Sequence, residues 1–191
     1  MTGTWPSGWA TGDVETAAEF KKGIGAISDT TLGGIAANVD ITSISATYAH
    51  LLLVTYARSD AAGTRALQLR FNGDATANYD HQQLLGTAAT VQAIETFAAA
   101  QIIAGFIPLS TDGANLFSAS VTFIPNYAGS TNNKLALSIS GLKIGTTTGL
   151  MANYLVGGFW RSAAAINRIT LLPNAGNFVA GTRVTLYGMG A

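Results

Sequence analysis

Oxygen-bearing side chains gather in one short stretch of this chain. Asn72, Asp74, Asn78 and Asp80 lie there with His81, all within ten residues. Hard cations such as Ca²⁺ prefer oxygen ligands presented by flexible loops. The spacing lacks the alternating ligands and the final Glu of the calcium-binding helix-loop-helix loop, however, and Asn and Asp also cap backbone groups in turns. We therefore expect a structural turn here, with no metal site and no cofactor.

The residues needed for hydrolytic catalysis do not form a recognisable motif. The sequence contains two histidines, His50 and His81, and many serines, but no Gly-x-Ser-x-Gly elbow. His50 opens an apolar segment, which favours a core or interface histidine over a general base. Asp74 and Asp80 are the carboxylates that a glycosidase pair would require, but clustered acidic loop residues usually face solvent. We predict that the chain is not an enzyme and has no catalytic residues.

Aromatic and basic residues near the carboxyl end suggest a ligand platform. Tyr154, Trp160, Arg161 and Arg168 are the candidates for stacking on a sugar or for cation–π contacts, which would make the chain a glycan-binding module for host-surface polysaccharide. The alternative is that the rings belong to the core while the arginines hold loops or neighbouring subunits. The basic residues after Asp112 form no cluster, so nucleic acid is not an expected partner.

The first 23 residues have the composition of a docking arm. Trp5 and Trp9 stand among Gly, Pro, Ser and Thr, which cannot form a core of their own. Asp13 is placed to cap a short helix that carries Phe20. Because large aromatic side chains anchor interfaces, we expect this arm, residues 1–23, to dock on another subunit. The alternative is a disordered leader with a frayed helix.

Charged residues are scarce in the sequence. Asp, Glu, Lys and Arg supply 20 of 191 residues, about 10%, where soluble domains carry about 25%. Apolar residues make up 48%, so the chain must bury apolar surface in a strand-rich core and against copies of itself or other subunits. All ten acidic residues lie at or before Asp112, and five basic residues follow it. The two parts either form faces of opposite sign or interleave, so that the asymmetry averages out.

From residue 24 onward the apolar period is two, with Gly, Asn, Pro and Ser between short segments, which predicts an all-β fold. We expect one antiparallel, jelly-roll-like β-sandwich over residues 24–191. The alanine-rich segment Thr87–Ala100 is expected to be a short helix or a loose loop. The predicted strands are Ala26–Thr31, Ala37–Thr42, Ala49–Ala57, Ala66–Asn72, His81–Leu85, Gln101–Pro108, Leu116–Pro125, Lys134–Leu142, Leu155–Arg161, Ile166–Leu172 and Arg183–Gly188.

Other sequence features limit compartment and chemistry. There is no cysteine, so neither disulfides nor a thiolate metal site are expected. The apolar runs are far shorter than the roughly 20 residues that span a bilayer, and no secretory signal is visible. We therefore expect no membrane span and synthesis in a cytoplasm.

Three segments resemble structural proteins of tailed bacteriophages. The segment Trp5–Phe20 is similar to the amino-terminal segment of many tail and fibre proteins. Two longer segments, Tyr48–Asp80 and Gly158–Gly188, look like a β-sandwich module of minor tail, tail-fibre or head-decoration proteins. The resemblance covers nearly the whole chain. No long fibrous repeat is present, which favours a compact knob or cement subunit.

The resemblance implies a virion component assembled in the host cytoplasm. The leading expectation is a tail-associated or receptor-binding knob that attaches to the host and docks by its arm. The alternative location is the capsid, as a decoration or head-fibre protein. The expected partners are copies of this chain, with a homotrimer favoured, and other virion proteins.

Overall fold

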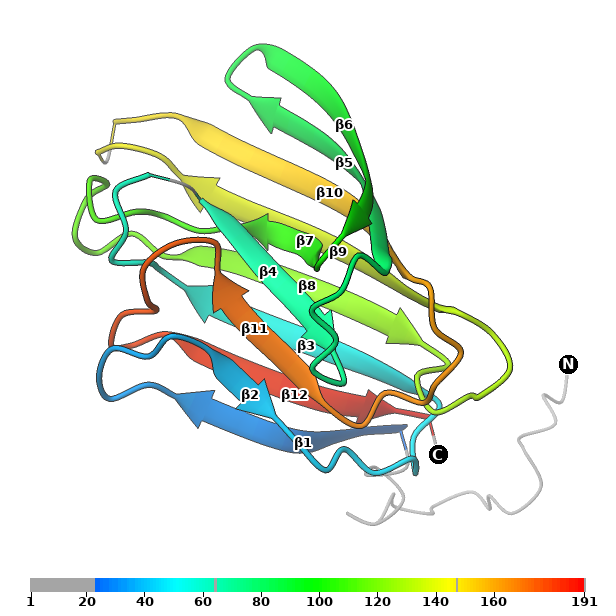
Figure 1. Ribbon diagram of the computed structural model, residues 1–191. Helices are drawn as coiled ribbons and strands as arrows, with labels where there is room; N and C mark the ends of the chain where they lie inside the picture. Colours follow the sequence, from blue (N-terminus) through cyan, green and yellow to red (C-terminus); the bar gives the residue numbers. More distant parts are fainter. Residues whose placement is uncertain (1–22, 64, 147, 191) are drawn as a thin grey trace, which may run out of the picture.

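The computed structural model describes residues 23–63, 65–146 and 148–190. Over these residues the chain forms twelve β-strands arranged in two sheets, and every strand pairing is antiparallel (Figure 1). The predicted all-β antiparallel fold is therefore confirmed. In this part of the chain no helix has the length and hydrophobicity to cross a membrane.

The larger sheet contains eight strands, and neighbours along the chain are often not neighbours in the sheet. Its strand order is β1-β12-β3-β8-β9-β10-β5-β6. The strands are β1 (Ile24–Thr31), β12 (Arg183–Met189), β3 (His50–Ala57), β8 (Ser118–Pro125), β9 (Lys134–Lys143), β10 (Met151–Trp160), β5 (Tyr79–Thr87) and β6 (Thr90–Ala99).

The smaller sheet contains four strands and lies over one face of the larger sheet (Figure 1). Its strand order is β2-β11-β4-β7. The strands are β2 (Val39–Ile41), β11 (Ile169–Pro173), β4 (Ala66–Phe71) and β7 (Ile102–Phe106). Because the smaller sheet has half as many strands, it leaves part of the larger sheet without a covering layer.

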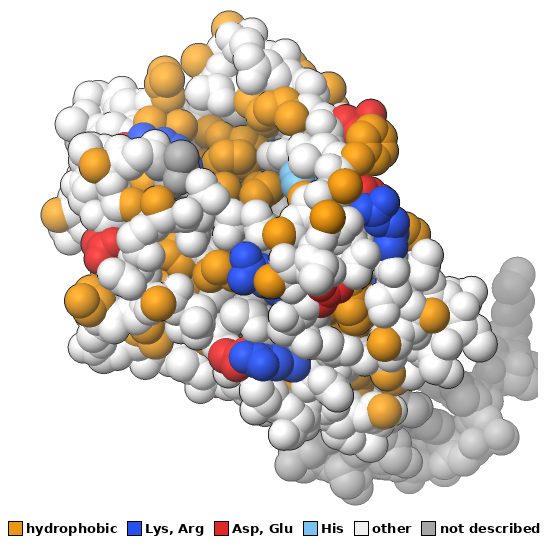
Figure 2. Space-filling view, viewed as in Figure 1, with side chains coloured by type: hydrophobic (Ala, Val, Ile, Leu, Met, Phe, Trp, Pro, Cys, Tyr) orange, Lys and Arg blue, Asp and Glu red, His pale blue; other side chains and the backbone are white. Residues whose placement is uncertain are grey.

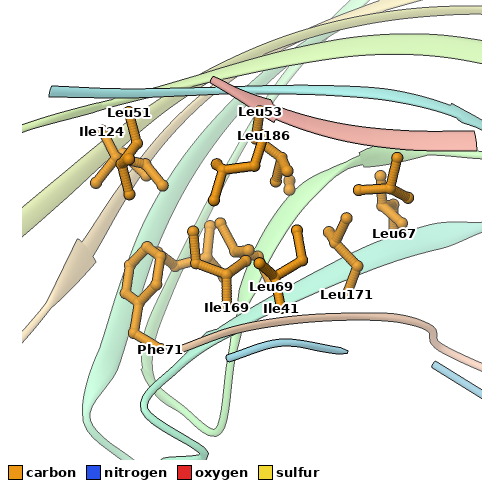
Figure 3. Close-up of a cluster of buried hydrophobic side chains, with 14 of the residues drawn as sticks. Ile41, Leu51, Leu53, Leu67, Leu69, Phe71, Ile124, Ile169, Leu171 and Leu186 are labelled. Atoms are coloured by element: carbon orange, nitrogen blue, oxygen red, sulfur yellow. The ribbon is translucent and has the colours of Figure 1, made fainter. Parts of the chain in front are cut away.

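The main core lies between the two sheets. Alternation in β4 turns Leu67, Leu69 and Phe71 inward, as the period of two predicts, and all three are essentially inaccessible to solvent. They meet inward residues of the larger sheet, which Figure 3 shows from the side. The facing side chains of the larger sheet include Leu51, Leu53, Ile124 and Leu186.

At β7 the two sheets approach unusually closely. Gly158 of β10 lies directly under Ile102, so that a Cβ atom there would stand 2.5 Å from the Ile102 Cγ2 atom. Gly105 has a φ of 151°, a conformation that residues with side chains rarely adopt. A Cβ on Gly105 would meet Ser140 of β9 at 2.7 Å. The inner residues that lie directly beneath Ile102 and Gly105, Gly158 and Ser140, must therefore be small.

The segment predicted as a short helix or loose loop, Thr87–Ala100, is a strand instead. It forms most of a hairpin in which β6 pairs with β5 along its whole length. The connection is two residues long, and Ala88 adopts a positive φ of 51°. Alanine content suggested a helix, but pairing with β5 gives the backbone its hydrogen bonds, and tertiary pairing outweighs the weak intrinsic preference. All eleven predicted strands are present, with ends shifted by up to four residues.

The acidic and basic parts of the sequence interleave in the fold. Asp29, Asp40 and Asp80 form ion pairs with Arg183, Arg168 and Arg161, respectively. Each pair joins a carboxylate from the first part to an arginine from the second. These pairs largely neutralise the charge asymmetry along the sequence. The alternative in which the two parts interleave is therefore the one that the structure shows.

The close approach at β7 gives a paired test of packing. Gly158→Ala is expected to destabilise the protein by about 1–3 kcal/mol, because the new methyl group meets a fully buried branched side chain. Gly157→Ala is the matched control, since Gly157 faces the other way and has no atom within 4 Å of an added Cβ. Both changes restrict the unfolded chain equally, so the difference in urea denaturation midpoints isolates the clash. Equal midpoints would contradict the close approach.

The ion pairs predict how stability changes in acid. Hydrogen bonds from Arg183 and Thr185 lower the pKa of Asp29 to about 2, below the ordinary value of about 3.9. A lowered pKa in the folded state stabilises the protein above the unfolded value, and this contribution is lost as pH falls toward 2. We expect Asp29→Asn to make the denaturation midpoint lower at neutral pH and less dependent on pH between about 4 and 2. Glu95→Gln, which removes an exposed carboxylate of β6, should keep the wild-type slope.

Candidate interaction surface

A row of apolar side chains crosses the face of the larger sheet that the smaller sheet leaves uncovered. The row contains Val54 of β3, Val121 of β8, Ile139 of β9, Leu155 of β10 and Leu84 of β5. Each residue is the direct cross-strand partner of the next. We call this row the outer stripe. Register pairing, and not proximity in sequence, brings the five residues together.

The outer stripe is open to solvent over most of its length. The exposed fraction is 61% for Ile139 and 47% for Leu84. A second apolar row lies beside it, in which Leu137 pairs with Phe123 and Phe123 with Leu52. Leu137 is also half exposed. The two rows form one apolar area over the middle of the sheet, and single exposed apolar residues need no explanation whereas a continuous area does.

Polarity is reversed across β8 and β9. Their inner faces carry hydroxyl residues, Ser118, Ser120, Thr122, Ser138 and Ser140, all buried. Their outer faces carry the large apolar residues just described. Thr122 and Ser138 share a hydrogen bond of 2.7 Å. Close approach of β7 accounts for small inner residues, but nothing in the described part of the chain accounts for the large apolar residues on the outer face.

Shallow hollows lie on both sides of Ile139. One, of about 330 Å³, forms where Gly141 leaves space beside Val121 and Asn153. The other, of about 320 Å³, forms where Gly86 leaves space beside Leu84 and Leu155. Ile139 lines both hollows. The surface therefore presents projections and depressions at neighbouring positions.

Charged groups on this face stand at strand ends or on the strands at its margins. They are Arg183 of β12 and its ion-pair partner Asp29 of β1, Lys143 at the end of β9, Asp80 near the start of β5 and Glu95 in the middle of β6. Arg183 and Asp80 are already in ion pairs. The opposite side of the molecule, seen in Figure 2, likewise shows charged side chains as a few separate groups on a mostly uncharged surface. The centre of the apolar area is thus free of charge.

The predicted oxygen-rich loop is a structural turn in the structure. The Asn72 Oδ1 atom accepts hydrogen bonds from the backbone of Asn167 and Arg168. Asp74 accepts from the backbone N–H of Thr76 at 2.9 Å. Burial raises the pKa of Asp74, but hydrogen bonds from Thr76, Trp160 and Asn78 outweigh it and hold the pKa below its usual range. Among the described residues, no group of three or more His, Asp or Glu side chains could hold a metal ion.

The rings of the predicted ligand platform lie on the inner face of β10. Trp160 is only 3% exposed, and its Nε1 atom donates to the Asp74 Oδ2 atom at 2.8 Å. Tyr154 stacks on Phe106, with ring centroids 4.0 Å apart. Both rings are thus covered by other parts of the chain.

The arginines of the predicted platform hold loops. Arg161 donates to the backbone oxygen of Ala77, and Arg168 is paired with Asp40. The structure therefore does not bring the four residues together as an exposed platform. The arrangement is the alternative expected from the sequence, in which rings pack inside and arginines hold loops.

The remaining predicted residues have plain structural surroundings or lie outside the described residues. The Nδ1 atom of His50 accepts a hydrogen bond from the backbone of Asn126, and its ring contacts Phe123. His81 is buried, and burial lowers its pKa. The arm residues Trp5, Trp9, Asp13 and Phe20, and the predicted helix, lie outside the described residues.

Sequence reasoning missed the outer stripe. The signal was present in β9, where Leu135, Leu137 and Ile139 alternate with small or polar residues. Ordinary patterning assigns such a row to the core. The structure places the row on the outer face. The sequence therefore revealed the two-residue period of the strand but not the face of the sheet on which the apolar row lies.

We compared this chain with protein-family models, with curated proteins and with solved structures, and none of the three comparisons found a match.

Proposed function

We propose that this chain is a non-enzymatic structural subunit that works by assembling with other subunits. The observation that carries the proposal is the outer stripe and the apolar row beside it, because soluble monomers rarely leave a large continuous apolar area uncovered. Low charge over the whole chain supports the same reading. On this proposal the fold is a jelly-roll-like sandwich that presents its uncovered sheet face to neighbouring subunits.

The particle that we propose is a tailed-phage virion, with this chain in or near the tail. The support is the resemblance of the segments Tyr48–Asp80 and Gly158–Gly188 to phage structural modules. In the fold these segments pair with one another in both sheets: β3 with β12, β4 with β11, and β5 with β10. The resemblance thus involves strands that lie side by side. An oligomer that carries the arm, including a short helix, at its docking end completes the proposal.

We do not extend the proposal to glycan binding, because Tyr154 and Trp160 have their rings covered. Loops at either end of the sheets remain the proposed outward parts of the subunit.

Particle localisation tests the proposed function directly. Antibodies raised against the purified chain should label particles released by the strain that carries this gene, and the electron micrographs should show the label at the tail. Label confined to the head would replace the tail with the capsid decoration alternative. Purified particles that lack the chain by mass spectrometry would refute the virion assignment.

Removal of the arm gives a second test. Deletion of residues 1–22 is expected to leave the unfolding temperature and the oligomer unchanged, because the core consists of residues from Val39 to Leu186. The shortened chain should no longer join the particle. The double variant Trp5→Ala, Trp9→Ala should lose incorporation in the same way. Full occupancy of the particle by the shortened chain would show that docking lies elsewhere.

A further inference from the structure

The outer stripe belongs to a surface large enough for a stable interface by itself. Six strands from β12 to β5, spaced about 4.8 Å apart, give a width of about 29 Å. Strands of about eight residues give a length of about 26 Å. The flat area is therefore about 750 Å², close to the roughly 800 Å² that each partner contributes to a standard interface. The side chains that project from the sheet increase the accessible area beyond this flat value.

Covering this face requires a partner that is also apolar and uncharged at its centre. Any charge placed against Ile139 or Leu155 would lose its water without gaining a counter-ion, since no charged residue of this face is a cross-strand neighbour of either side chain. A second copy of this chain satisfies the requirement because it presents the same uncharged area. The smaller sheet cannot do so, since it lies on the other side of the larger sheet.

The relief of the face is suited to its own copy. Ile139 projects between two hollows of about 320 and 330 Å³. In a symmetric interface, the projection of one copy meets a hollow of the other and the reverse contact follows by symmetry. Asn153 lines both hollows, and its side-chain amide would then face the partner and favour one register.

We propose that the outer stripe is the contact between copies of this chain, with Ile139 at its centre. The inference rests on the proposed function and deepens it, because it names the partner and the surface. Burial of the two apolar rows between copies accounts for the reversed polarity of β8 and β9: each strand lies between two cores, one within the chain and one between copies. The small hydroxyl residues face the tighter core.

A charge at the centre of the stripe tests the proposal. In sedimentation equilibrium at micromolar concentration, the full-length protein should have a mass of at least twice the 19.6 kDa of one chain. Ile139→Lys should raise the dissociation constant by about 100-fold or more, because an unpaired ammonium group becomes buried. The variant should fold normally, since the side chain is mostly exposed within one chain. Ile35→Lys is the matched control, because Ile35 is 71% exposed and lies in the loop between β1 and β2.

Cysteine cross-linking gives a second readout that does not depend on weakening the contact. The chain has no cysteine, so one introduced thiol reports without background. Ile139→Cys treated with a short bis-maleimide should give a covalent pair of chains, whereas Ile35→Cys should not. A monomer at all concentrations would overturn the proposal. An oligomer that survives both Ile139→Lys and the double change with Leu155→Lys would also overturn it and place the contact elsewhere.

The alternative occupants have their own outcomes. If the full chain is a monomer and deletion of residues 1–22 increases binding of a hydrophobic dye, the arm covers the stripe and the proposal is wrong. Antibody labelling of particles is independent of these results. A monomeric protein found at the tail would thus reject the contact between copies while leaving the virion assignment in place.

Discussion

The close approach of β7 to the larger sheet is the constraint from which the distribution of side chains follows. Ile102 packs on the backbone of Gly158, and Gly105 lies against Ser140. Larger residues in place of Gly158 or Ser140 would push the sheets apart and open voids in the core. Those large apolar side chains of β8 and β9 that do not fit on the inner face lie on the outer face. One steric requirement is therefore linked to the surface through which we propose that the molecule assembles.

Long-range pairing ties this arrangement together. In the larger sheet β12 pairs with β1 and β3, β3 pairs with β8, and β10 pairs with β5, so these neighbours come from distant parts of the chain. The ion pairs of Asp29, Asp40 and Asp80 likewise each join the two parts of the sequence. Apart from the pairings of consecutive strands, most of the sheet can form only once distant parts of the chain have come together, which is the situation that slows β-protein folding. The chain has little charge to keep an incompletely folded form in solution, and the association with other copies that we propose would also protect the apolar face.

The sequence predicted much of the fold and little of the candidate surface. Alternation and turn residues located eleven strands, because both signals are local. The strand β6 was missed because its alanines favour a helix and only pairing with β5 overrides them. Lys134 shows the limit of local reasoning: it is 2% exposed, its Nζ atom donates to the backbone oxygens of Asn132 and Ala163, and burial lowers its pKa. Which side chains of β9 point inward depends on β7, a strand that is distant in sequence from the alternating residues of β9.

The two ends of the described chain meet at one corner of the larger sheet. Ile24 pairs with Met189, and the backbone N–H of Gly190 donates to the Gly23 oxygen at 3.0 Å. In a chain trimmed to residues 23–190, a short peptide would bridge this gap and close the backbone into a ring, which new ends at the exposed turn between β5 and β6 would reopen. The same geometry means that a fusion partner added at residue 190 would leave from the sheet edge, well away from its middle, where Ile139 stands.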